Sequence, residues 1–275
     1  MKEWVQRSAW MLAAMVVVGG CSAAQRAGAS KGVASVLISD EQEIQIGKQV
    51  KAELEKDPNF RYVEDPAVVD YVTRLATPIL QSANEVRRAP WKLHVVDDDK
   101  VVNAFATPGG FLYIYTGLIL AADNEAELAG VLGHEAAHVT ERHSARALVN
   151  QYGIQAVTAL ALGENANLLG QITSTIAGQG LMLANSRSAE NEADRAGAHF
   201  SNGGGYDPRG LATFFEKLKA EQGSTPGILA FLSTHPDPGD RVQNVNRIIQ
   251  EDNLKATGGR SPGRLEEIKA RIRNN

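Results

Sequence analysis

The stretch Val131-Leu132-Gly133-His134-Glu135-Ala136-Ala137-His138 decides how the rest of the chain is interpreted. Two histidines four residues apart lie on one face of an α-helix, with Cβ atoms about 5–6 Å apart. Both imidazoles then reach a single zinc ion at about 2.0–2.1 Å. Glu135 projects beside them, where it is better placed to take a proton from a water at the metal than to be the primary ligand. The pattern predicts zinc ligands His134 and His138 and a general base, Glu135.

The motif alone leaves one alternative, in which two histidines simply pack on a helix face. With only 6 His in 275 residues, chance produces the pattern in about 1 in 100 chains of this composition. A third ligand discriminates the two interpretations. Metzincins carry it as a histidine six residues after the second motif histidine, but Ser144 stands there and Glu141 replaces the intervening glycine. A di-iron site needs a second Glu-x-x-His, which the sequence lacks.

The stretch Ser186-Arg187-Ser188-Ala189-Glu190-Asn191-Glu192-Ala193-Asp194 supplies the third ligand. Glu190 and Asp194 are four residues apart and share a helical face, so Glu190 can bind zinc while Asp194 accepts from the outer nitrogen of a ligand histidine. Glu192 points elsewhere on the same helix. Taken alone, the stretch also fits a solvated acidic surface. Paired with the first motif, it predicts one zinc ion per chain, held by His134, His138 and Glu190.

The hydrophobic pattern predicts a mostly helical α+β fold in which a small sheet precedes the motif helix. The His-Glu-x-x-His motif adds the expectation that this fold is a zincin-type metallopeptidase domain. The predicted strands are residues 91–96 and 111–115, the second following a turn at 107–110. The predicted helices are 39–56, capped by Ser39, 66–81, 124–148, capped by Asn124, 209–221 and 240–251.

The segment 147–184 carries only one charged residue, Glu164. Polar residues and glycines interrupt it too often for a membrane span. We therefore expect a buried helical pair. Because the segment follows the motif helix, we also hypothesise that part of it covers the cleft as a lid.

The N-terminus predicts export and lipidation. Two basic residues precede the apolar run 9–18, which is too short to cross about 30 Å of hydrocarbon and is typical of a secretory signal peptide. Val18-Gly19-Gly20-Cys21 resembles a bacterial lipobox, and its cysteine is the only one in the chain. The alternative is an ordinary cleavage site with an incidental cysteine. Lipidated Cys21 followed by Ser22 predicts attachment to the outer membrane, facing the periplasm.

Six short motifs resemble the HtpX-like and CAAX-prenyl-protease-like gluzincin family of metallopeptidases, in its secreted bacterial lipoprotein branch. The matching motifs are residues 103–110, 115–118, 134–138, 190–194, 205–208 and 234–236. They stand in the family's order and cover most of the predicted domain. The resemblance implies the same zinc ligands, the same base and Asp194 behind a ligand histidine.

The resemblance also implies roles for two further parts of the chain. His235 would lie close to the metal, where it stabilises the oxyanion or occupies the open zinc position in a resting state. The alternative for His235 is an ordinary loop histidine beside a proline. Residues 103–106 or 111–115 would form a sheet edge along which an extended peptide lies, so that the enzyme selects unfolded segments. His94, His143 and His199 have no partner spacing and are interpreted as structural or surface residues.

The chain thus divides into a signal peptide (1–20), a lipidated flexible tether (21–38), a zinc metallopeptidase domain (39–256) and a polar C-terminal tail (257–275). Its length allows one substantial core without disulfides. A net charge of -4 gives no basic surface, so no nucleic-acid partner is expected.

The expected function is hydrolysis of unfolded or misfolded envelope proteins, a quality-control role that the resemblance implies, with the envelope assembly machinery as a further partner. The first alternative is a catalytically silent, zinc-bearing assembly or chaperone lipoprotein. The second is a small-molecule metallohydrolase, which would need a narrow pocket instead of a long groove. The retained Glu135 argues against the first, because a purely structural site has no use for a base.

Overall fold

The structure is a computed structural model that describes residues 38–179, 186–221, 227–235, 238–255 and 263–274. The predicted signal peptide, Cys21 and nearly all of the tether lie outside the described residues. The elements are, in order, α2 (Asp40–Leu54), α3 (Pro66–Val86), β1 (Lys92–Val96), β2 (Ala104–Thr107), β3 (Phe111–Tyr115), α4 (Thr116–Ala121), α5 (Glu125–Thr140), α6 (His143–Tyr152), α7 (Ile154–Ala161), α8 (Ala166–Gln179), α9 (Arg187–Gly203), α10 (Gly210–Ala220), α11 (Ile228–Thr234), α12 (Pro238–Glu251) and α13 (Leu265–Arg273).

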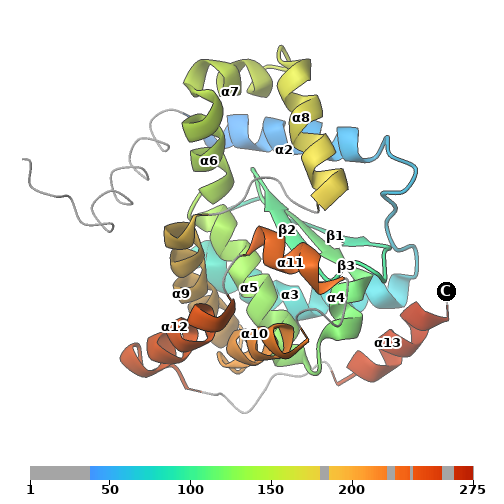
Figure 1. The fold of residues 1–275 in the computed structure, drawn as a ribbon, viewed down its shortest axis with the longest axis vertical. Helices are drawn as coiled ribbons and strands as arrows, with labels where there is room; N and C mark the ends of the chain where they lie inside the picture. Colours follow the sequence, from blue (N-terminus) through green and yellow to red (C-terminus); the bar gives the residue numbers. More distant parts are fainter. Residues whose placement is uncertain (1–37, 180–185, 222–226, 236–237, 256–262, 275) are drawn as a thin grey trace, which may run out of the picture.

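A three-stranded sheet lies between two groups of helices, with α2, α6, α7 and α8 on one side and α3, α5, α9 and α10 on the other (Figure 1). β3 is central, β1 runs parallel to it, and β2 runs antiparallel to it. The tight β2–β3 turn places Gly109 and Gly110 at φ +80° and +88°, a conformation that glycine adopts without strain. Because β3 is central, only residues 104–107 meet the expectation of a sheet edge. Residues 111–115 do not, and that alternative was wrong.

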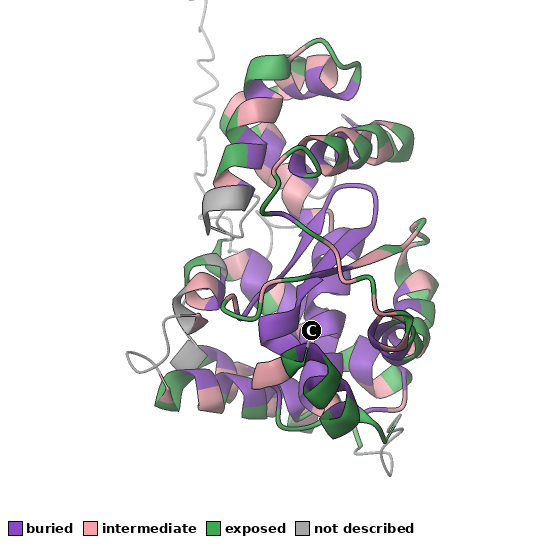
Figure 2. Ribbon diagram, turned by 90° about the vertical axis from the view of Figure 1, so that its right-hand side faces the viewer, coloured by how far each residue is buried: buried purple, intermediate pink, exposed green. Residues whose placement is uncertain are grey.

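The alternation of side chains along β3 divides the hydrophobic interior into two cores. Leu112 and Ile114 pack with α3 and α5 in the larger core, whereas Phe111, Tyr113 and Tyr115 face the smaller core of α2, α7 and α8. Buried residues concentrate in the sheet and α5, and the outer helices carry the exposed ones (Figure 2). The expected mostly helical α+β fold, with a small sheet ahead of the motif helix, is confirmed.

The prediction of one helix over 124–148 was wrong, because α5 ends at Thr140 and α6 begins at His143. Arg142 between them has φ +58°, in the left-handed region that few non-glycine residues adopt. Its guanidinium contacts the buried carboxylate of Glu43 and the carbonyl of Ile38. These contacts turn the chain away from α5 and direct α6 along a new path.

Most other predicted elements are present, with shifted ends. The capping box of Ser39 and Gln42 starts α2, and α3 continues past 81 to Val86. β2 was expected only through the family resemblance, as a sheet edge at 103–106, and no local pattern indicated α4 or α11 as separate elements. The polar tail also contributes to the core, because Leu265, Ile268 and Ile272 of α13 are buried among core residues.

The described part of the segment 147–184 forms the end of α6 and the helices α7 and α8, so the helical pair is present, but the expectation that it is buried was wrong, because only one face of it is covered. Val157, Leu160, Ile172 and Ile176 bury its apolar face in the smaller core. Residues 180–184 lie outside the described residues, and a lid role for the segment stays a prediction. None of the helices in the described part of the chain combines the length and hydropathy needed to cross a membrane.

Candidate metal centre

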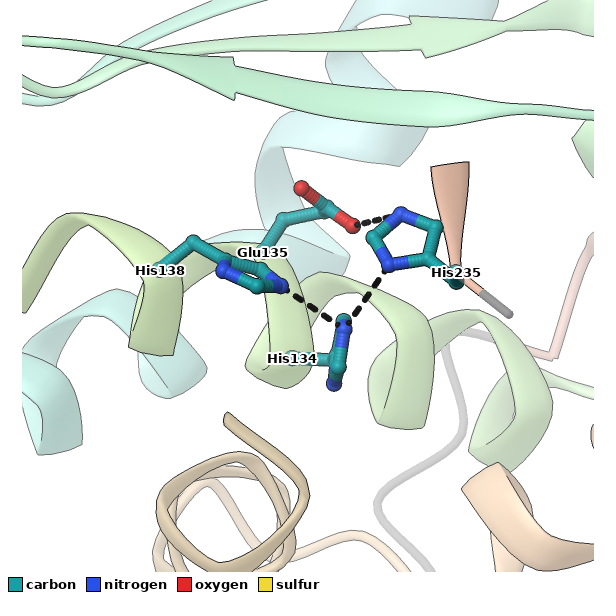
Figure 3. A group of neighbouring side chains, drawn as sticks. All are labelled: His134, Glu135, His138 and His235. Carbon is teal, nitrogen blue, oxygen red and sulfur yellow. Dashed lines mark hydrogen bonds and ion pairs between the residues drawn. The ribbon is translucent and has the colours of Figure 1, made fainter. Parts of the chain in front are cut away.

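The motif residues lie on a helix that is buried along most of its length. The Asn124 side chain caps α5 by accepting from the Glu127 N–H at 3.1 Å. His134 is fully buried, and Glu135 and His138 are 2% and 4% exposed. Nε2 of His134 and Nε2 of His138 are 2.9 Å apart, so both imidazoles point at one place (Figure 3).

Helix α9 brings two carboxylates to the same place because it crosses α5 at two glycines. A Cβ on Gly133 would stand 2.6 Å from the Gly197 carbonyl oxygen, and a Cβ on Gly197 would stand 2.7 Å from the backbone nitrogen of His134. The close approach carries Glu190 to the histidines. Its Oε2 lies 3.4 Å from His134 Nε2, and its Oε1 lies 3.5 Å from His138 Nε2.

Asp194 and Arg241 form the layer behind His134. Asp194 Oδ1 lies 3.1 Å from His134 Nδ1, and both side chains are completely buried. The Arg241 guanidinium contacts both Asp194 oxygens and lies 2.8 Å from Glu190 Oε2. Its Nη2 is 3.2 and 3.3 Å from the two nitrogens of His134 and so lies off the lone-pair axis of either. The Nδ1 proton of His134 therefore has the Asp194 carboxylate as its acceptor.

His235 directly follows α11, and its side chain points into the same centre (Figure 3). Its Nδ1 is 3.2 Å from His134 Nε2 and 3.0 Å from Glu190 Oε2, and its Nε2 is 3.2 Å from Glu135 Oε1. Donor atoms of His134, Glu135, His138 and His235 all lie within 4.8 Å of one another. Glu190 is part of the same cluster, because its two carboxylate oxygens lie 3.4 and 3.5 Å from Nε2 of His134 and of His138.

The donor set fits zinc. Tetrahedral ligands at 2.0–2.1 Å from zinc are about 3.3 Å apart, and the spacings among His134, His138 and Glu190 are 2.9, 3.4 and 3.5 Å. Both motif histidines also turn their Nδ1 atoms toward other partners, which leaves their Nε2 atoms facing each other. In addition, the buried Oε1 atoms of Glu135 and Glu190 accept no well-formed hydrogen bond and face only histidine nitrogens, at 3.2 Å in His235 and 3.5 Å in His138. A cation at this position would satisfy these groups.

Burial and charge pairing set the ionisation of the cluster. Burial, together with His134, holds the pKa of His138 well below its usual value, which keeps the imidazole neutral as a ligand must be. Burial alone would raise the pKa of Glu190, but His235 and His134 hold it well below its usual value. Burial would lower the pKa of His235, but Glu190 and Glu135 raise it to about 9.

The structure brings together every residue expected at the site except Cys21, which lies outside the described residues. It also adds Arg241, His143 and Glu192, which the sequence reasoning missed. Arg241 stands in the first turn of α12, where the helix dipole disfavours a cation, so its position was a usable signal for an ionic partner. His143 is buried, as a structural residue would be, and its Nδ1 lies 2.8 Å from His138 Nδ1, a contact that no sequence spacing predicted.

The remaining two histidines have structural or surface positions, as expected. His94 stacks on the rings of Tyr62 and Tyr113 beside the smaller core. His199 is nearly half exposed and pairs with Asp252 on the surface.

Comparison with known proteins relates this centre to metallopeptidases. The model of the family described as peptidase family M48 matches residues 64–249, which include the whole metal centre. The chain is 32% identical over 185 residues to the mitochondrial metalloendopeptidase OMA1 of Schizosaccharomyces pombe, covering 67% of this chain and 54% of the relative.

Bacterial relatives show comparable similarity. The beta-barrel assembly-enhancing protease of Escherichia coli is 33% identical over 222 residues, covering 76% of this chain and 44% of the relative. The putative beta-barrel assembly-enhancing protease of Vibrio cholerae is 35% identical over 194 residues, covering 67% and 40%. The chain thus matches about half the length of these curated relatives.

Proposed function

The chain belongs to peptidase family M48, and on that premise we propose that it is a zinc-dependent metalloendopeptidase of unfolded or misfolded envelope proteins. The ligands would be His134, His138 and Glu190, with one zinc ion per chain. The observation that carries the proposal is the Glu135 carboxylate, which is buried beside the ligand cluster with its Oε1 3.2 Å from His235 Nε2. A structural zinc site has no use for such a group, whereas peptide hydrolysis requires a base there.

In the proposed reaction, bound zinc supplies a Lewis acid for the scissile carbonyl and for the attacking water. Glu135 takes the proton from that water and later gives it to the departing amine. Asp194 holds the His134 imidazole by accepting from Nδ1. Arg241 offsets the charge of Glu190 and Asp194, so that both carboxylates stay ionised in a dry interior.

His235 would occupy the fourth zinc position in a resting state. Its Nδ1 has spacings to His134 and Glu190 close to those expected between tetrahedral ligands. Displacement of His235 would then open the position that substrate needs, and the freed imidazole would be available to the oxyanion. The expected lid at 147–184 would belong to the same latent state, in which a substrate has to displace it.

Unfolded substrates would be bound at the free edge of β2. β2 is an outer strand that packs against α5, and an extended peptide that pairs with it would run along the metal centre. Main-chain pairing is independent of side chains, which suits an enzyme of broad sequence preference. All four residues of β2 are buried, so pairing would require that its cover move.

We further propose that the protein is attached to the outer membrane by lipidated Cys21 and faces the periplasm. The sequence supports this through the lipobox-like residues 18–21. The bacterial relatives are named for enhancing β-barrel assembly, which supports the envelope assembly machinery as a partner. Labelled palmitate should enter the wild type and not Cys21→Ala, and equal labelling of both would exclude the anchor.

The activity is tested by zinc content and casein hydrolysis of the wild type, Glu135→Gln and Glu190→Ala. We expect the wild type to bind about one zinc and cleave. Glu135→Gln should keep the metal and lose cleavage by at least about 100-fold, because only the base is removed. Glu190→Ala should lose metal. Glu216→Gln makes the same chemical change on the exposed face of α10 and should behave as wild type.

Two results would support other functions. If the wild type binds zinc and cleaves no unfolded protein even after His235→Ala, the silent assembly lipoprotein is favoured. If small esters are hydrolysed and extended peptides do not compete, the protein is a small-molecule metallohydrolase. If Glu190→Ala keeps full zinc affinity, Glu190 is not the third ligand.

A further inference from the structure

We propose that His143 and Glu192 form a relay of hydrogen bonds that holds the imidazole of His138 in its metal-binding tautomer. The inference rests on the proposed zinc site and deepens it, because it assigns positioning roles to two residues outside the predicted ligand set. Neither residue touches the reacting atoms.

The three side chains come from three helices and form a row of two successive contacts. His138 of α5 and His143 of α6 face each other through their Nδ1 atoms at 2.8 Å. The other nitrogen of His143, Nε2, lies 3.3 Å from Glu192 Oε2 of α9. The side chain of His143 is 1% exposed and that of Glu192 is 19% exposed, so the inner contact is dry and its outer end is near solvent.

Proton placement follows from the chemistry of the last group. Arg146 Nη1 lies 3.0 Å from Glu192 Oε2 and keeps this carboxylate ionised, so the carboxylate can only accept. His143 must then donate from Nε2. A neutral imidazole carries one proton, so His143 Nδ1 is an acceptor, and the donor across the 2.8 Å contact is His138 Nδ1. His138 is left with an unprotonated Nε2, the atom that points at the metal centre.

The proposed zinc ligation gives the same assignment. A histidine that binds a metal through Nε2 keeps its proton on Nδ1. In His138 that atom faces Nδ1 of His143, which is therefore the acceptor.

The relay gives the two motif histidines equivalent supports. His134 Nδ1 meets the Asp194 carboxylate directly, whereas His138 Nδ1 reaches the Glu192 carboxylate through His143. Helix α9 therefore provides a ligand and both terminal acceptors at residues 190, 192 and 194. Glu192 points away from Glu190, as the helical period requires, and meets α6 because the chain turns at Arg142.

The first measurement reads the tautomers directly. Long-range proton–nitrogen NMR of the metal-free full-length wild type with labelled histidine should show His138 protonated at Nδ1 and His143 protonated at Nε2. Signals are assigned from His138→Gln and His143→Asn. A His143 protonated at Nδ1 would overturn the proposal, whatever the protein does with metal.

The second measurement is zinc affinity, by competition with a chelating dye. His143→Leu removes the acceptor and should weaken zinc binding by about 10- to 100-fold. His143→Asn places an amide oxygen near the position of Nδ1 and should restore most of the affinity. Glu192→Gln should weaken binding less than His143→Leu. His199→Leu is the matched control, because it removes a histidine–carboxylate pair on the surface of α9 and should not change the affinity.

The outcomes separate this inference from the proposed function. Wild-type affinity in folded His143→Leu, verified by circular dichroism, would overturn the relay and leave the zinc site intact. If the wild type binds no zinc, the proposed function fails, while the tautomers of the metal-free protein still decide the relay. If His143→Leu does not fold, the wild-type tautomers and the affinity of Glu192→Gln decide it.

Discussion

At the scale of single residues, the centre is a set of buried charges that stabilise one another. Glu190, Asp194 and Arg241 are all at most 3% exposed. Charges in such a place require partners, because an unpaired buried ion costs several kcal/mol. Arg241 is the main cation of this set in the described part of the chain, and it also packs over the ring of Phe215 at 4.1 Å. The identity of residue 241 thus affects stability as well as the metal ligands.

We predict that Arg241→Met lowers the free energy of unfolding of the metal-free protein by about 3–5 kcal/mol. The substitution leaves two carboxylates buried without their cation. Urea unfolding monitored by circular dichroism measures the change.

Arg247→Met is the control on the same helix, because Arg247 pairs with Glu251 at the exposed surface. Such pairs are worth about 0–1 kcal/mol, so little change is expected. Equal losses of unfolding free energy in the two variants would mean that the buried ion pairs of Arg241 contribute no more to stability than a surface pair does.

At the scale of elements, the left-handed residue Arg142 between α5 and α6 sets the direction of α6 and of the helices α7 and α8 that follow it. We predict that Arg142→Gly is more stable than Arg142→Ala by about 1 kcal/mol. Both variants lose the guanidinium, so their difference isolates the strain at φ +58°. Thermal unfolding gives the comparison.

The order should reverse at an ordinary helical position. At Glu216 within α10, alanine should be more stable than glycine by about 1 kcal/mol. If alanine is also preferred at 142, the left-handed turn is not part of the folded protein in solution.

The crossing of α5 and α9 is the second element that the site depends on. We predict that Gly197→Ala costs about 1–3 kcal/mol of stability and weakens zinc binding, because the new methyl group meets the backbone of His134 at 2.7–2.8 Å. Gly170→Ala on α8 is the control, since a Cβ there has open space. It should be neutral or stabilising. Unfolding curves and dye competition check both; a stable Gly197→Ala with normal affinity would contradict the close packing.

The sequence predicted local features well and long-range ones poorly. The cap at Ser39, the strand at 111–115 and the ligand spacing of His134 and His138 each follow from neighbours along the chain. The break at Arg142 depends on Glu43, 99 residues away, so no local pattern reveals it. For the same reason the contact of Glu192 with His143 had no signal in either motif.

At the scale of the whole molecule, the metal centre joins elements of the larger core that lie far apart in the chain. Its donors come from α5, α9 and the residue after α11. The smaller core, with α2, α7 and α8, supplies none of the proposed ligands. Zinc should therefore stabilise one side of the molecule more than the other.

We predict that removal of zinc by a chelator speeds amide hydrogen exchange in α9 and at His235 more than in α2, α7 and α8. Binding to the folded state alone stabilises it by about 2.7 kcal/mol at 100-fold excess over the dissociation constant, and opening that separates the ligands loses this contribution. Mass spectrometry of the wild type with and without zinc measures it. Glu135→Gln should respond as the wild type does, because its ligands are complete. Glu190→Ala should show no zinc dependence, since α9 then lacks its ligand. A uniform response across both cores would mean that zinc is linked only to global unfolding, and the separation of the two cores would have no consequence for how the site opens.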